Sequence, residues 1–125
     1  MILPLTIHLA LRACRAEGEP SESLAMTLDI DAIHKALANP VRREILAWLK
    51  EPGAYFPAQE LPLDCGVCAG QINARCGLSQ STVSAHLATL QSAGLVTVNR
   101  IGQWSFFKRN EAVIEAFLAS LRDEL

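Results

Sequence analysis

The chain has 125 residues, half of them hydrophobic, and a formal net charge of −2 at pH 7. This length suits one compact domain with an ordinary core. No run of 18 apolar residues is present, which excludes a membrane-spanning helix. The apolar N-terminus lacks the basic segment of a secretory signal. Four cysteines without framework spacing favour a reduced, cytoplasmic protein over a disulfide scaffold.

The charges are unevenly distributed along the chain. Of the 13 acidic residues, nine lie at or before Asp64 and four at or after Glu111. The stretch from Ala69 to Asn110 has no acidic residue and a charge of +4 from four basic side chains: Arg75, Arg100, Lys108 and Arg109. Such a block can approach a polyanion without repulsion, although a buried, uncharged core would give the same composition.

Residues 1–25 end in a polar stretch and have no pattern that joins them to the rest of the chain. We expect them to be a loosely ordered extension, or an over-extended gene start with true initiation at Met26. The folded domain is therefore predicted to span residues 26–125.

Two helices are predicted at the start of this domain. Ile30, Ile33 and Leu37 lie at helical spacing in a helix that ends near Asn39. Asn39 is an N-cap residue, and Pro40 suits the first position of the next helix. The buried stripe of this second helix, which stops before Pro52, is predicted to be Val41, Ile45, Trp48 and Leu49. Residues 55–64 are expected to form a loop. Arg42 and Arg43 could contact phosphate or pair with Glu44 and its neighbours, and pairing is the favoured interpretation.

A short helix, a turn and a longer helix come next. The short helix is predicted from Ala69 to Cys76, with Ile72 and Cys76 facing inward, and Gly77 supplies a left-handed turn residue. Ser79 is a strong N-cap for the longer helix, which Gly94 closes. Its apolar positions keep the i, i+4, i+7 spacing: Val83, Leu87 and Leu90.

The C-terminal third is predicted to be a β-hairpin and then a helix. Residues 95–99 and 103–109 are β-rich and surround a turn at 100–102. Asn110 caps the last helix. The predicted fold is mainly α with a small β-hairpin wing, in the order α-α-α-α-β-β-α: a winged helix-turn-helix.

In a helix-turn-helix, the second helix enters the major groove of DNA and offers its N-terminal side chains to base edges and phosphates. The hairpin would be a wing with Arg100 at its tip. The residues predicted to contact DNA are Ser79, Gln80, Ser81, Thr82, Ser84 and His86 of the helix, and Arg100, Gly102 and Gln103 of the wing. The alternative is that this polar face is only solvated surface.

Three segments carry a resemblance to a known family: LANPVRREIL, LSQSTVSAHLATLQSAGLV and RIGQWSFFKR. The chain from Leu28 to Leu125 closely resembles the ArsR-type (arsenic-repressor, SmtB-like) winged-helix regulators. The resemblance implies a cytoplasmic homodimer that represses its operon and leaves double-stranded operator DNA when an effector binds. A two-fold dimer is expected to recognise an inverted repeat.

The resemblance also implies that the first and last helices form the dimer interface. The last helix independently carries more apolar surface than one small domain can cover, which indicates a partner. The residues predicted at the interface are Ile30, Ile33, Leu37, Val113, Ile114, Phe117, Leu118 and Leu121.

Cys65 and Cys68 form a C-x-x-C pair just before the short helix. They are candidate ligands of a soft metal or metalloid effector (arsenite, zinc or cadmium), or a thiol-redox switch, or incidental cysteines. Metal-sensing relatives usually carry C-x-C inside the helix, so the spacing here departs from the family pattern. Cys76 lies about 12 Å along a helix from Cys68, too far to hold the same ion. A third ligand would be Cys14, a histidine or a partner's group.

Other functions have little support. The sequence has no glycine-rich phosphate loop, nucleophile elbow or clustered carboxylate pair, so an enzyme is not expected. The alternatives that stay open are a winged-helix module that binds proteins instead of DNA, and an ArsR-type regulator with no metal site. The polar, acid-free helix face favours DNA.

Overall fold

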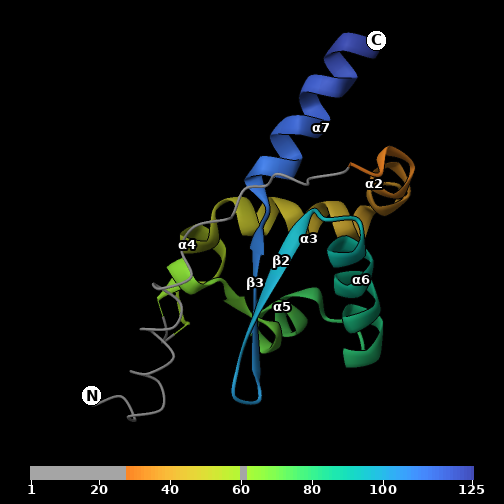
Figure 1. Ribbon diagram of the computed structural model, residues 1–125. Helices are drawn as coiled ribbons and strands as arrows, with labels where there is room; N and C mark the ends of the chain where they lie inside the picture. Colours follow the sequence, from red (N-terminus) through yellow and green to blue (C-terminus); the bar gives the residue numbers. More distant parts are fainter. Residues whose placement is uncertain (1–27, 60–61) are drawn as a thin grey trace.

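A computed structural model describes residues 28–59 and 62–125 of the chain (Figure 1). The expectations for residues 1–25 and for Met26 as the start lie outside these residues. The helices are α2 (Ile30–Leu37), α3 (Pro40–Lys50), α4 (Pro52–Tyr55), α5 (Ala69–Cys76), α6 (Gln80–Ser92) and α7 (Glu111–Glu124), with a 3-10 turn at Leu63–Cys65. The strands are β1 (Val67–Cys68), β2 (Val96–Ile101) and β3 (Trp104–Arg109). The predicted winged helix-turn-helix is confirmed.

Side-chain caps fix where the long helices begin. Asn39 Oδ1 accepts from the N–H groups of Val41 and Arg42, at 2.8 and 3.2 Å. Asp29 and Asn110 cap α2 and α7 in the same way. These contacts satisfy N–H groups that have no partner within the helix. Both asparagines were predicted as caps from their positions in the sequence.

The described strands form one antiparallel sheet in the order β1-β3-β2. The hairpin register pairs Ile101 with Trp104, so its turn is Gly102–Gln103, and Gly102 has a φ of 63°. The predicted turn at 100–102 was therefore too early. Arg100 lies on strand β2 opposite Ser105, not at the tip of the wing.

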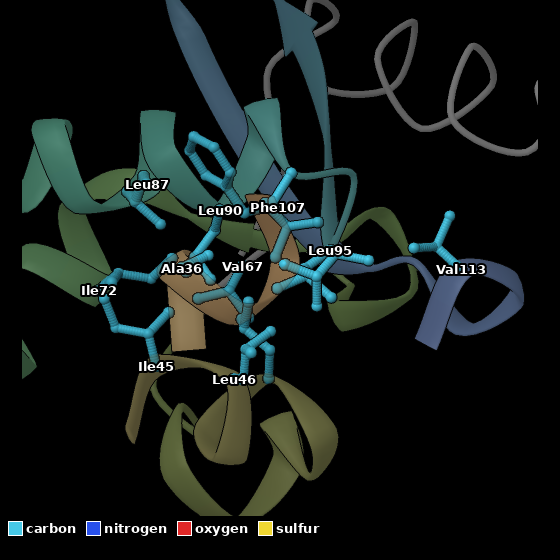
Figure 2. Packing of buried hydrophobic residues seen from close by; sticks show 14 of the residues in the cluster. Ala36, Ile45, Leu46, Val67, Ile72, Leu87, Leu90, Leu95, Phe107 and Val113 are labelled. Atoms are coloured by element: carbon cyan, nitrogen blue, oxygen red, sulfur yellow. The ribbon is translucent and has the colours of Figure 1, made fainter. Parts of the chain in front are cut away.

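One apolar core joins the helices to the sheet (Figure 2). Ile45 of α3, Ile72 of α5 and Leu90 of α6 are fully buried in it, and Phe107 reaches it from β3. Figure 2 shows these side chains converging between α3, below, and α6, above. The core therefore fixes α5, α6 and the wing relative to one another.

The segment before α5 differs most from the prediction. Residues 55–64 were expected to be a loop, but α4 includes Tyr55 and a 3-10 turn begins at Leu63. Strand β1 was not predicted; it pairs Val67 with Phe107 and Cys68 with Phe106. In α3 the core contains Leu46, which the predicted stripe omitted, while Trp48 and Val41 are only partly buried.

Gly66 allows β1 to reach the sheet. Its φ of 109° lies in a region that side chains rarely adopt, and a Cβ there would be 2.9 Å from the Phe107 carbonyl oxygen. Gly53 provides the contrast, because a Cβ there would meet nothing within 4 Å.

We predict that Gly66→Ala lowers the free energy of unfolding by about 2 kcal/mol or more, through backbone strain and the contact with β3. Gly53→Ala should leave it unchanged or raise it by up to about 1 kcal/mol. Urea denaturation of both variants measures the difference. Equal stabilities would show that Gly66 is not required by the β1–β3 contact.

Candidate nucleic-acid interface

Helices α5 and α6 form the helix-turn-helix. Gly77 ends α5 in the left-handed conformation, with a φ of 68°. Ser79 then begins α6: its Oγ accepts from the Thr82 N–H at 3.2 Å and donates to Thr82 Oγ1 at 2.8 Å. The predicted turn residue and cap are both confirmed. The hydroxyls of Ser79 and Thr82 are thereby held at the N-terminal end of α6.

Helix α6 has one buried and one exposed side. Val83, Leu87 and Leu90 are at most 4% exposed and anchor the helix in the core. The predicted DNA contacts Ser79, Gln80, Ser81, Thr82 and Ser84 are all exposed. The first turn of α6 has no acidic residue, and its free N–H groups carry the positive end of the helix dipole. This surface offers hydrogen-bonding groups and a favourable field to a phosphate.

His86 is placed differently from the other predicted contacts. It is half-buried, and its Nδ1 lies 3.1 Å from Nη1 of Arg42. Arg42 and Arg43 were expected to pair with Glu44. Instead, both donate to backbone carbonyls at the end of α2. His86 therefore connects α6 to α3 at the edge of the polar surface.

The wing lies at the same end of the molecule as the N-terminal end of α6, opposite the C-terminus of α7 (Figure 1). Arg100, Gly102 and Gln103 are all exposed there. Trp104 is 41% exposed beside the turn and contacts Phe106 edge-on. The sequence analysis did not include Trp104; a bulky aromatic next to a hairpin turn is the signal that was available.

Two of the four basic side chains of the acid-free block, Arg75 and Arg109, have partners within the protein. The Arg75 guanidinium lies 5.2 Å from the Trp48 ring centre and 4.8 Å from that of Tyr55. Arg109 forms an ion pair with Glu111 at 2.8 Å, which lowers the pKa of Glu111. Arg100 and Lys108 are exposed. The block therefore presents less free positive charge than its composition indicates.

The C-x-x-C segment lies between the wing and the helix-turn-helix. Cys68 belongs to β1, which pairs with wing strand β3, and is also the N-cap residue of α5. The Gln59 side chain fixes the segment, donating to the Gly66 carbonyl at 3.0 Å and accepting from the Cys68 N–H at 2.8 Å. A change at these cysteines would therefore act on both elements of the candidate interface.

The cysteines differ in state. Cys65 is 4% exposed and disulfide-bonded, whereas Cys68 and Cys76 are free. Burial raises the pKa of the Cys76 thiol, and the nearby Glu44 carboxylate raises it further.

Cys14, a candidate third ligand, lies outside the described residues. In the parts of the chain that are described, no three His, Cys, Asp or Glu side chains meet in a group able to hold a metal. The described residues therefore do not by themselves provide a three-ligand metal site.

The predicted dimer residues divide into two groups. Ile33, Val113 and Phe117 are at most 7% exposed and belong to the core of the single chain. Leu118 is 47% exposed, and the remaining residues are partly buried: Ile30, Leu37, Ile114 and Leu121. His34, on α2, contacts Phe117 edge-on at 5.3 Å. Helices α2 and α7 therefore lie next to each other.

Among the described helices, none is long and apolar enough to cross a membrane.

Comparison with known proteins gives consistent matches. The pattern of "Bacterial regulatory protein, arsR family" matches residues 67–98, which include α5, α6 and the start of β2. An uncharacterized HTH-type transcriptional regulator of Bacillus subtilis, YbzH, is 39% identical over 74% of this chain and 95% of its own. A putative arsenical resistance operon repressor of Halobacterium salinarum, ArsR2, is 33% identical over 89% of this chain and 82% of its own.

A solved structure agrees with the fold. The homodimeric winged helix-turn-helix DNA-binding domain from Mycobacterium bovis, a possible ArsR-family regulator, matches with a TM-score of 0.54 and 26% identity. The match covers 86% of this chain and 90% of that domain. The helix order, the wing and the sequence similarity lead to one conclusion: this chain belongs to the arsR family of bacterial transcriptional regulators.

Proposed function

We propose that this protein is a cytoplasmic homodimeric repressor that binds an inverted repeat in double-stranded operator DNA through α6 and the wing. The observation that carries this proposal is the division of α6 into a buried apolar side and an exposed polar side. A helix held in this way can enter the major groove without leaving the core. An enzyme or a protein-binding module would not require this polar N-terminal turn.

The chemistry of the exposed side chains suits DNA. Gln80 can form paired hydrogen bonds with an adenine edge, and the hydroxyls of Ser81 and Ser84 can bond to bases or phosphates. Arg100 and Gln103 of the wing would contact the neighbouring backbone, and Trp104 would add apolar contact with the sugars. Most of the affinity would come from phosphate contacts and would fall with salt.

We predict that Ser81→Glu combined with Thr82→Glu reduces operator affinity by about 100-fold or more, because two carboxylates would face the phosphates. Acidic residues near a helix N-terminus favour the helix, so the fold and the dimer should persist. Fluorescence anisotropy with a duplex that the wild-type protein selects from a random pool measures the affinity. Gln91→Glu with Ser92→Glu adds the same charge at the other end of α6 and should weaken binding far less. Equal losses would refute a specific role of the N-terminal turn.

The dimer is proposed to form through a second face of α7. Ile114, Leu118, Leu121 and Leu125 follow one another at i, i+4, i+7 and i+11, on a face that adjoins the core residues Val113 and Phe117. Ile114 and Leu121 also pack against the core of their own chain. Leu118 and Leu125 are 47% and 98% exposed. The C-terminal part of α7 extends away from the rest of the fold (Figure 1). A second copy would cover this apolar stripe, and two-fold symmetry would place two α6 helices about 34 Å apart, one turn of DNA.

We expect Leu118→Asp to convert the dimer to a monomer in sedimentation velocity, because the carboxylate would have to be buried between two subunits. Ala119→Asp changes an exposed neighbour outside the stripe and should leave the dimer intact. A dimeric Leu118→Asp protein would show that another surface holds the subunits together.

The effector is proposed to act at Cys65 and Cys68. The support is their position, since β1 connects the wing to the first residue of α5. Thiol oxidation is the favoured chemistry because Cys65 is disulfide-bonded. Breaking or forming a bond at this segment would move β1 against β3 and change how the wing and α6 face DNA.

We predict that diamide oxidation of the reduced protein, which forms the Cys65 disulfide again, releases the wild-type protein from the selected duplex but not the Cys65→Ser variant. Cys76→Ser is the matched control and should respond as wild type, because the raised pKa of Cys76 keeps its thiol protonated and unreactive at neutral pH. Arsenite, zinc and cadmium, titrated in parallel under reducing conditions, test the soft-metal alternative. Equal release of the Cys65→Ser variant would rule out Cys65 as the sensor.

A further inference from the structure

Arg42 connects three elements of the fold through its guanidinium. Its Nε donates to the Ala36 carbonyl at 2.7 Å, and its Nη2 donates to the Lys35 carbonyl at 3.2 Å. Its Nη1 lies 3.1 Å from Nδ1 of His86 on α6. Arg42 itself is in the first turn of α3. One side chain therefore binds the end of α2 and α6 at the same time.

The two carbonyls belong to the last turn of α2, where backbone oxygens lack the usual i+4 partner; the Lys35 carbonyl also accepts from the N–H of the C-cap residue Ala38 at 3.2 Å. A cation is also favoured at this end of the helix dipole. The neighbouring Arg43 makes one such contact, from Nη1 to the Leu37 carbonyl at 2.7 Å. Within the described residues, its side chain makes no hydrogen bond to α6. Arg42 is therefore held by α2 in the position from which it reaches His86.

The contact with Arg42 selects one tautomer of the His86 ring. A guanidinium has only donors, so Nδ1 of His86 must accept, and an accepting Nδ1 carries no proton. The neutral ring then carries its proton on Nε2. His86 lies one turn after Thr82 on α6, next to the exposed polar side. Its Nε2–H is thus set as a hydrogen-bond donor at the edge of the candidate DNA surface.

We propose that Arg42 is a positioning residue for DNA recognition: it holds the His86 ring with Nδ1 as an acceptor and Nε2–H as a donor to an acceptor oxygen or nitrogen of the duplex. This inference rests on the proposed function. It differs from a direct phosphate contact by Arg42, because two of the guanidinium's three nitrogens are used on α2 and the third on His86. A lysine would keep the charge but, with a single ammonium, cannot make this three-way contact.

The first experiment examines the free protein and does not depend on DNA. Nitrogen-15 spectra of the histidine rings, at about pH 8 where an ordinary histidine is neutral, should show His86 of the wild-type protein with an unprotonated Nδ1 and a protonated Nε2. In Arg42→Lys the ring should exchange between both tautomers. Arg43→Lys is the matched control and should leave the His86 signals unchanged. A proton on Nδ1 in the wild type, or a ring that is unaffected by Arg42→Lys, overturns the inference.

The second experiment is a double-mutant cycle on affinity for the selected duplex. Arg42→Lys and His86→Leu should each weaken binding about ten-fold, the loss expected for one hydrogen bond with a charged or tightly held partner. The double variant should be no weaker than either single variant, because Arg42 acts through His86. Losses that multiply to about 100-fold would mean that Arg42 acts independently of His86, and would overturn the inference.

The two experiments separate this inference from the proposed function. If the wild-type protein selected no duplex, the proposed function would fail while the ring spectra still tested the contact. Binding to an unrelated duplex identifies the acceptor of the His86 hydrogen bond. His86→Leu lowers the affinity for both duplexes when the acceptor is a phosphate, and only for the selected duplex when it is a base edge. If Arg42→Lys folds poorly, two measurements still test the inference: the wild-type spectrum shows whether the proton is on Nε2, and the His86→Leu affinity shows whether His86 contributes to DNA binding.

Discussion

The burial of Val83, Leu87 and Leu90 is the constraint on which the rest of the structure depends. These side chains are at most 4% exposed and join α6 to the same core as α3, α5 and β3. Because a helix has a fixed repeat, locking one side of α6 determines where every other side chain on it points. The exposure of Ser81, Thr82 and Ser84 is thus a consequence of apolar packing.

The second constraint is the coupling between distant segments. Val67 pairs with Phe107 across the sheet, Gln59 holds the turn before β1, and Arg42 connects α2 to His86. Each contact ties a part of the chain that is not proposed to touch DNA to the helix-turn-helix or the wing. The signal proposed at the cysteine segment would therefore have a short, covalent and hydrogen-bonded route to the elements proposed to bind DNA.

Much of the fold could be predicted from the sequence because its signals are local. Asn39, Ser79 and Asn110 indicate where helices begin through their caps, and Gly77 indicates the turn through its left-handed backbone. The α6 surface was predicted from these boundaries and a helical repeat. The residues proposed to contact DNA were identified in this way, with their roles still to be tested.

The missed features all depend on long-range contacts. Strand β1 has two residues and no periodicity of its own, and it exists because β3 pairs with it. The contacts of Arg42 with His86 and of Arg75 with Trp48 join distant segments, so they could not be predicted from local pattern. Apolar spacing does not distinguish a core from an interface: Ile33 and Phe117, which were predicted at the dimer interface, are buried in the core of the single chain.

The most direct test of the central claim is a titration of the nitrogen-15-labelled protein with the selected duplex, monitored by backbone NMR shifts. The account predicts that the largest changes fall on residues 79–84 and 100–104, with α4 unaffected. Changes confined to other surfaces, or no change at any duplex concentration, would contradict it.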